Sequence, residues 1–109
     1  MATTYKVLGQ VNPSATTNTT LYTVPSATQA VVSTISVCNQ AGTAATFRIA
    51  IRVAGSAISA EEYIVYGATV PASDSTFFTL GLTLAATDVI TVYASSANVS
   101  FNAFGSEIS

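Results

Sequence analysis

The chain has 109 residues, of which half are hydrophobic, only 7% are charged and none is histidine. Because an ordinary soluble domain is about 25% charged, Ser, Thr, Asn and Gln must keep the polar faces of this chain hydrated. Three cations and a net charge of -2 leave almost nothing for counterion-release binding, so we expect no nucleic-acid partner.

The apolar residues do not form a membrane-spanning pattern, although the mean hydropathy is +0.53. Thr or Ser interrupts them every second or third position, and no run approaches the roughly 18 apolar residues of a spanning helix. Residues 1–10 lack the basic region, apolar stretch and cleavage site of a secretory signal. We therefore expect no membrane partner and a protein made in the cytoplasm without a signal peptide.

The first twenty residues differ in composition from the rest of the chain. Tyr5 to Val11 is a weak strand candidate, and the polar stretch after Asn12 has no apolar anchor until Leu21. We interpret residues 1–19 as an N-terminal strand or arm with a polar linker, and residues 20–109 as the body of one domain. The arm folds back as an edge strand or reaches a neighbouring copy, and the alternative is a long surface loop within one protomer.

Alternation with a period of two dominates the body, which is the spacing at which side chains line one face of a strand. In chain order the strands that we expect are residues 5–11, 20–24, 31–37, 47–53, 62–66, 78–84, 90–94 and 99–103. Short turn signals such as Asn12-Pro13 and Pro25-Ser26 separate them, and one helical turn is possible near residues 56–62. This pattern predicts an all-β, antiparallel β-sandwich of jelly-roll or Ig-like type with about eight strands.

The alternation also assigns faces. One apolar face is expected to contain Val31, Ser33, Ile35 and Val37, and another Phe47, Ile49, Ile51 and Val53. Phe77 and Phe78 must point to opposite sides of their strand, so one of them lies in a second apolar layer or at an interface. Cys38 is expected to be a small buried packing residue, with an exposed interface position as the alternative.

No residue cluster specifies a reaction. A nucleophilic hydroxyl needs a base, and without histidine only Lys6 or a carboxylate remains. Glu61 and Glu62 are adjacent and are expected to be solvated, whereas Asp74 and Asp88 precede strands, where a carboxylate caps backbone amides. The glycines are isolated, so no phosphate-binding loop is present. We expect no enzyme activity, no cofactor and no metal site.

A few residues are candidates for partner contacts. Arg48 and Arg52 share a strand face, where they contact an acidic surface or protect the sheet against aggregation. Tyr5 and Lys6 in the N-terminal segment, and Phe77, complete the predicted contact set. Tyr63 and Tyr66 are the local candidates for stacking on a sugar, and core or subunit packing is the alternative.

Several segments together resemble a group of short proteins of tailed bacteriophages. They are residues 21–25 (LYTVP), 30–39 (AVVSTISVCN), 82–93 (LTLAATDVITVY) and 104–108 (FGSEI). The resemblance covers most of the chain from Leu8 onward, but it is a pattern of strands and turns and contains no functional motif.

The resemblance implies an all-β virion accessory protein of the decoration or cement type. Such a protein is expected to be a homo-oligomer, such as a trimer, on the capsid surface, with the major capsid protein as its partner. The alternatives are a tail, neck or fibre component that binds a receptor, and a carbohydrate-binding module.

Overall fold

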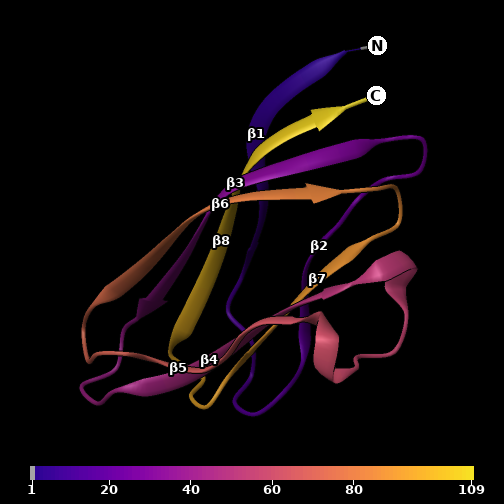
Figure 1. The fold of residues 1–109 in the computed structure, drawn as a ribbon. Coiled ribbons are helices and arrows are strands. Elements are labelled where there is room, and N and C mark those ends of the chain that lie inside the picture. Colours follow the sequence, from indigo (N-terminus) through magenta and orange to yellow (C-terminus); the bar gives the residue numbers. More distant parts are fainter. Residues whose placement is uncertain (1) are drawn as a thin grey trace.

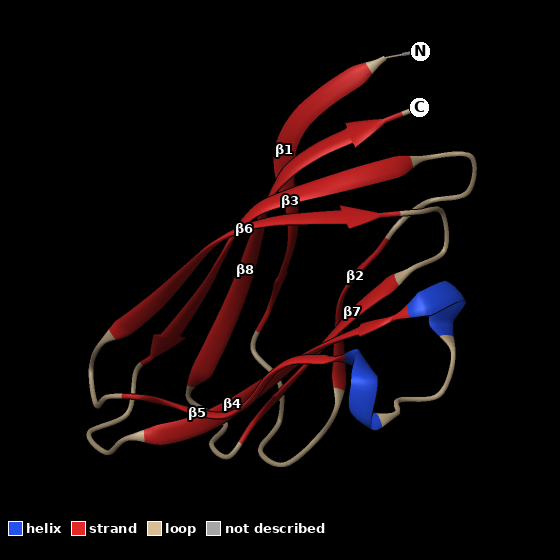
Figure 2. Ribbon diagram, in the orientation of Figure 1, coloured by secondary structure: helices blue, strands red, loops and turns tan. Residues whose placement is uncertain are grey.

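The computed structural model describes residues 2–109, which form eight strands and two single turns of 3-10 helix (Figure 2). The elements are β1 (Thr3–Val11), β2 (Thr19–Thr23), β3 (Gln29–Asn39), β4 (Ala45–Arg52), η1 (Val53–Gly55), η2 (Ala60–Glu62), β5 (Tyr63–Val70), β6 (Ser75–Leu84), β7 (Val89–Ala94) and β8 (Val99–Ile108). All eight expected strands are present, and the helical turn expected near residues 56–62 is η2.

The strands form two four-stranded antiparallel sheets, in the orders β1-β8-β3-β6 and β2-β7-β4-β5 (Figure 1). Strand β1 pairs with β8, β2 with β7, β3 with β6, and β4 with β5, as if one long hairpin had been rolled up. This connectivity is that of a jelly roll. The sequence left open a jelly-roll or an Ig-like sandwich, and the strand order decides for the first.

The core lies between the two sheets. Phe47 of β4 and Phe101 of β8 are at most 1% exposed, and their ring centroids are 6.2 Å apart in an edge-to-face arrangement. The ring of Phe78, from β6, packs on Phe47 at 5.9 Å, whereas its neighbour Phe77 is 68% exposed. The expectation that these two phenylalanines face opposite sides of their strand is confirmed.

A β-bulge in β3 overturns the face predicted for that strand. The register of β3 with β8 shifts between Val32 and Thr34, whose partners Gly105 and Phe104 are adjacent, so Ser33 is an extra residue relative to β8. The register with β6 shifts at the same place. Because one extra residue reverses the side-chain alternation, Val32 and Ile35 are both fully buried, whereas Val31 is on the outer face. The prediction that Val31 shares a face with Ile35 is therefore wrong.

Two further expectations about burial are corrected. Val53 does not continue the apolar face of β4, because the strand ends at Arg52 and Val53, 62% exposed, begins η1. Cys38 is only half-buried and lies in an outer row of its sheet, opposite Ser75 and Ser100. The core position next to it belongs to Val37, which points to the other side of the strand.

The N-terminal segment forms an edge strand, β1, that pairs with β8 along its whole length (Figure 1). Ala2 and Ser109 exchange backbone hydrogen bonds of 2.7 and 2.9 Å, so the two ends of the described chain lie side by side. Asn12 anchors the segment that follows, since its side-chain amide donates to the carbonyls of Ala97 and Val99. The division into residues 1–19 and 20–109 stays a prediction.

Candidate functional site

Arg48 is the centre of an aromatic row on the outer face of the β2-β7-β4-β5 sheet. It is paired in register with Tyr66 of β5 and Tyr93 of β7. Its guanidinium lies 4.4 Å from the centroid of the Tyr66 ring and 4.2 Å from that of Tyr93, which is cation–π geometry on both sides. Arg48 is therefore held in the sheet by two rings.

Arg52, on the same face, is engaged by the loop that follows its own strand. Its Nε donates to the Ser56 carbonyl at 2.6 Å, and its terminal nitrogen donates to the Gly55 carbonyl at 2.8 Å. Glu62 closes this loop from the other side, because it accepts hydrogen bonds from the Ser56 hydroxyl and the backbone of Ser59. The arginine orders the β4–β5 connection.

Lys6 and Glu107 form an ion pair of 3.2 Å at the open end of the sandwich. The other carboxylate oxygen of Glu107 accepts a 2.5 Å hydrogen bond from the hydroxyl of Tyr22, which comes from the opposite sheet. The hydrogen bond from Tyr22 and, less strongly, Lys6 hold the pKa of Glu107 below its usual value. Burial, together with the adjacent carboxylate, raises the pKa of Tyr22.

Replacing Tyr22 with Phe should make the stability of the protein less dependent on pH. The depressed pKa of Glu107 stabilises the fold above about pH 4.3, and this contribution is lost as the pH falls through the folded-state pKa. We expect Tyr22→Phe to cost about 1.5 kcal/mol at pH 7, since it removes a hydrogen bond to a charged group, and less at pH 3.

The same substitution should act in the opposite sense in alkali. The raised pKa of Tyr22 means that the parent loses stability as the pH rises above about 10, and the variant lacks this loss. Urea unfolding at pH 3, 7 and 10.5 measures both effects, with Tyr5→Phe, at a residue that is 83% exposed, as the control. If the free energies of unfolding of the parent and Tyr22→Phe differ by the same amount at all three pH values, the proposed role of the Tyr22–Glu107 hydrogen bond is wrong.

Both aspartates act as the turn caps that the sequence predicts. Asp88, directly before β7, accepts 2.9 Å hydrogen bonds from the backbone amides of Ala54 and Ala85. Asp74, directly before β6, accepts one of 2.7 Å from the amide of Ser75. These carboxylates therefore fix loop conformations.

All eight charged side chains of the sequence have a partner within the chain. The ion pair, the stacked Arg48, the loop contacts of Arg52 and Glu62, and the two aspartate caps account for seven. Glu61 is the eighth, and it accepts a 2.6 Å hydrogen bond from the Ser59 hydroxyl, which lowers its pKa. Glu61 is exposed, as expected, and Glu62 is half-buried, and both belong to the η2 turn.

The two tyrosines considered for sugar stacking lie together beside an open groove of about 580 Å³. The register shift between β4 and β5 places both on the outer face, and their rings meet edge to face at 4.9 Å. Tyr66 is 65% exposed, so it is not a core residue. The remaining lining residues are Ile58, Ser59 and Ala60.

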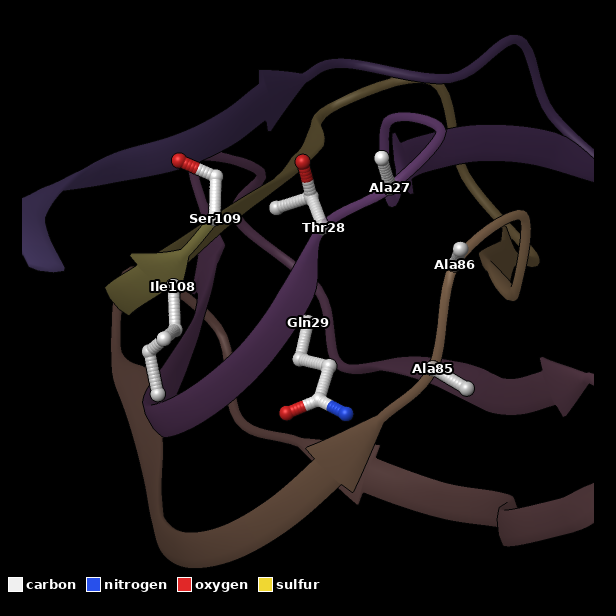
Figure 3. Close-up of a pocket in the computed structure, with 7 residues that line it drawn as sticks. All are labelled: Ala27, Thr28, Gln29, Ala85, Ala86, Ile108 and Ser109. Carbon is white, nitrogen blue, oxygen red and sulfur yellow. The ribbon is translucent and has the colours of Figure 1, made fainter. Parts of the chain in front are cut away.

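A second hollow, of about 320 Å³, lies between the ends of β3, β6 and β8 (Figure 3). Its lining consists of Ala27, Thr28, Gln29, Ala85, Ala86, Ile108 and Ser109. None of these side chains titrates, and the methyl groups of the alanines provide little for a ligand to bind. The hollow supplies no chemistry.

The predicted contact residues do not form one cluster. Tyr5 and Phe77 lie on the outer face of the β1-β8-β3-β6 sheet, at its two edge strands. Arg48 and Arg52 are on the outer face of the other sheet, and Lys6 points toward Glu107. Their role in partner contact stays a prediction.

Within residues 2–109, no three metal-ligating side chains come together. None of the helical segments in the described part is long and apolar enough to cross a membrane. No protein-family model matches this chain, and no curated protein sequence is significantly similar to it.

Sequence reasoning missed the contacts between side chains distant in sequence. Nothing near Tyr22 indicates that its hydroxyl meets Glu107, because the two are 85 residues apart. The burial of Asn39, which is 0% exposed, was missed as well. The available signal was its place at the end of an alternating apolar run, in register with Val37.

Proposed function

We propose that this chain is a structural protein of a phage virion, and most specifically a decoration or cement protein bound to the capsid shell. The observation that carries this proposal is the internal engagement of all eight charged side chains. A surface with few charges, each of which has a partner, costs less to desolvate than a heavily charged surface when another protein packs against it, which favours a role in contact over a role in chemistry. The resemblance to short virion accessory proteins supplies the setting.

In this role the protein adds buried contact area between neighbouring capsomers. Binding to the assembled shell, and not to separated capsomers, stabilises the assembly by mass action. An interface of standard size, about 800 Å² per partner, is within reach of a domain with 5408 Å² of accessible surface. The mechanical result is resistance to the pressure of packaged genome.

We expect particles stripped of this protein to lose their genome at a temperature at least several degrees lower than intact particles. Adding back the purified protein should restore the original temperature, since the proposed effect is reversible binding. Dye access to DNA during heating measures the release. Stripped particles that are as heat-resistant as intact ones would remove the cement role and favour a tail, neck or fibre component.

The groove at Tyr63 and Tyr66 favours one alternative function, binding of a carbohydrate. An exposed ring beside a polar turn is a suitable platform for a sugar face. A glycan array distinguishes this alternative, because binding that is lost in Tyr63→Ala would support it. An array without any signal would leave the groove as a packing feature.

A further inference from the structure

The outer face of the β1-β8-β3-β6 sheet contains no charged residue. The charged residues in these described strands are Lys6 and Glu107, and both belong to rows that face the other sheet. The three central outer rows are Tyr5-Ser106-Val31-Thr83, Val7-Phe104-Thr34-Thr79 and Gln10-Asn102-Ser36-Phe77. The face is thus a mixture of apolar, hydroxyl and amide side chains across four strands.

We propose that this face is a homotypic interface, on which a second copy of the chain packs sheet to sheet about a two-fold axis. A two-fold contact brings the same patch of both copies together, so a charged side chain on this patch lies near the identical side chain of the other copy and is repelled by it. A face without charge avoids this repulsion completely. The proposal concerns the free protein and does not depend on the virion assignment.

The polar groups on the face favour the same occupant. Hydroxyl and amide side chains are both donors and acceptors, so each can hydrogen-bond to a copy of itself. A lysine offers only donors and a carboxylate only acceptors, so neither can hydrogen-bond to a copy of itself. A surface that binds a charged partner would carry lysines or carboxylates, and this face has neither. Thr34 and Asn102 lie on the two central strands of the face, Thr79 lies beside Thr34 on the edge strand β6, and all three are suited to such pairing.

The apolar groups have the distribution expected of an interface. Tyr5 is 83% exposed, Phe77 is 68% exposed and Val7 is 47% exposed, all on this one face. With the half-buried Val31 and Phe104, which lie in the same rows as Tyr5 and Val7, they form an extended apolar area, and such an area on a folded domain marks a contact surface. Tyr5 and Phe77 lie on the opposite edge strands, so a partner covering both must cover the whole sheet.

The size of the face fits a stable pair. Strand β8 has 10 residues, and with about 3.3 Å per residue and about 4.8 Å between strands the face measures roughly 33 by 19 Å. Pleating and side chains raise its accessible area above the projected ~600 Å², close to the ~800 Å² per partner of a standard interface. Two sheets of this kind pack face to face at about 10 Å.

The test is the mass of the purified chain in solution, measured by light scattering during gel filtration between about 1 and 100 μM. We expect a particle of twice the 11.1 kDa chain mass. Thr79→Lys, which places a charge on this face at an exposed position of β6 beside Thr34, should weaken the pair at least tenfold. Thr20→Lys introduces the same charge on an exposed position of the other sheet and should leave the pair intact.

Circular dichroism establishes that both variants are folded. A monomeric parent at 100 μM would overturn the proposal, as would the mass of three chains, which excludes a closed two-fold pair. A dimer that tolerates Thr79→Lys, or one that Thr20→Lys dissociates, would also overturn it, because the contact would then lie elsewhere.

Discussion

Replacing Gly105 with Ala is expected to lower the free energy of unfolding by about 3 kcal/mol and the melting temperature by about 15 °C. Gly105 lies in β8 opposite Val32, next to the β3 bulge. A Cβ at this position would overlap the carbonyl oxygen of Val31, and it would be 3.0 Å from the Val31 carbonyl carbon and from the Val32 Cα. Since these are backbone atoms, a rotamer change cannot relieve the overlap.

The matched control is Gly81→Ala, in the same sheet. A Cβ added at Gly81 would have nothing within 4 Å. We expect this variant to be as stable as the parent or slightly more stable, because alanine restricts the unfolded chain. Thermal unfolding followed by circular dichroism compares the two variants. Equal melting temperatures for Gly105→Ala and Gly81→Ala would show that the backbone of β3 at the bulge does not pack tightly against Gly105.

Replacing Asn39 with Asp is expected to destabilise the protein by about 3 kcal/mol or more at pH 7. Asn39 is 0% exposed, and its side-chain nitrogen donates to the carbonyls of Thr43, Val70 and Pro71 at 2.8, 3.3 and 3.2 Å. Its side-chain oxygen accepts from the amide of Ala41. A carboxylate in this place would direct negative charge at three carbonyl oxygens.

This loss should shrink in acid. Burial and the carbonyls raise the pKa of the introduced carboxyl above the value of about 3.9 in the unfolded chain. Between these two pKa values the folded state binds more protons than the unfolded state, so the variant becomes less stable as the pH rises. Urea unfolding of Asn39→Asp from pH 4 to pH 7 should therefore show a steady decline relative to the parent.

Asn98→Asp is the control, since it makes the same chemical change at an exposed position. It should change stability by less than about 0.5 kcal/mol over the same range. If Asn39→Asp and Asn98→Asp have the same free energy of unfolding at pH 7, then Asn39 does not connect the β3–β4 and β5–β6 loops in the way that its hydrogen bonds indicate.

The strands could be predicted because alternation is a local property. Phe47, Ile49 and Phe101 lie on faces that the sequence pattern identifies, and each is buried between the sheets. The pairing of the strands could not be predicted in this way, since the partner of β1 is β8, at the other end of the chain. A jelly roll consists of such distant pairs, so local signals establish its elements and not their order.

The irregular features escaped prediction for a related reason. Nothing in the sequence around Ser33 indicates an extra residue, because the bulge is defined by the register of β3 with β8. The role of Arg48 depends on the same distant pairing, which places Tyr66 and Tyr93 on either side of it. By contrast, Asp74 and Asp88 accept hydrogen bonds from the nearby amides of Ser75 and Ala85, and these caps were predictable. The further hydrogen bond from Ala54 to Asp88 was not.

In the sequence, the scarcity of charge argues against catalysis. In the structure, it also distinguishes one surface, the outer face of the β1-β8-β3-β6 sheet. One sheet presents a face free of charge, and the charges elsewhere are engaged with the chain itself. Such a surface is suited to packing against another protein surface. This is the physical link between its composition and the structural role that we propose.

The number of copies of this chain per virion tests that role most directly. Quantitative mass spectrometry of purified particles, with the major capsid protein as internal standard, gives the number, and a cryo-electron microscopy map gives the location. The decoration role predicts many copies, in a fixed ratio to the capsid protein and distributed over the shell. About a dozen copies or fewer, confined to the tail or neck, would contradict it.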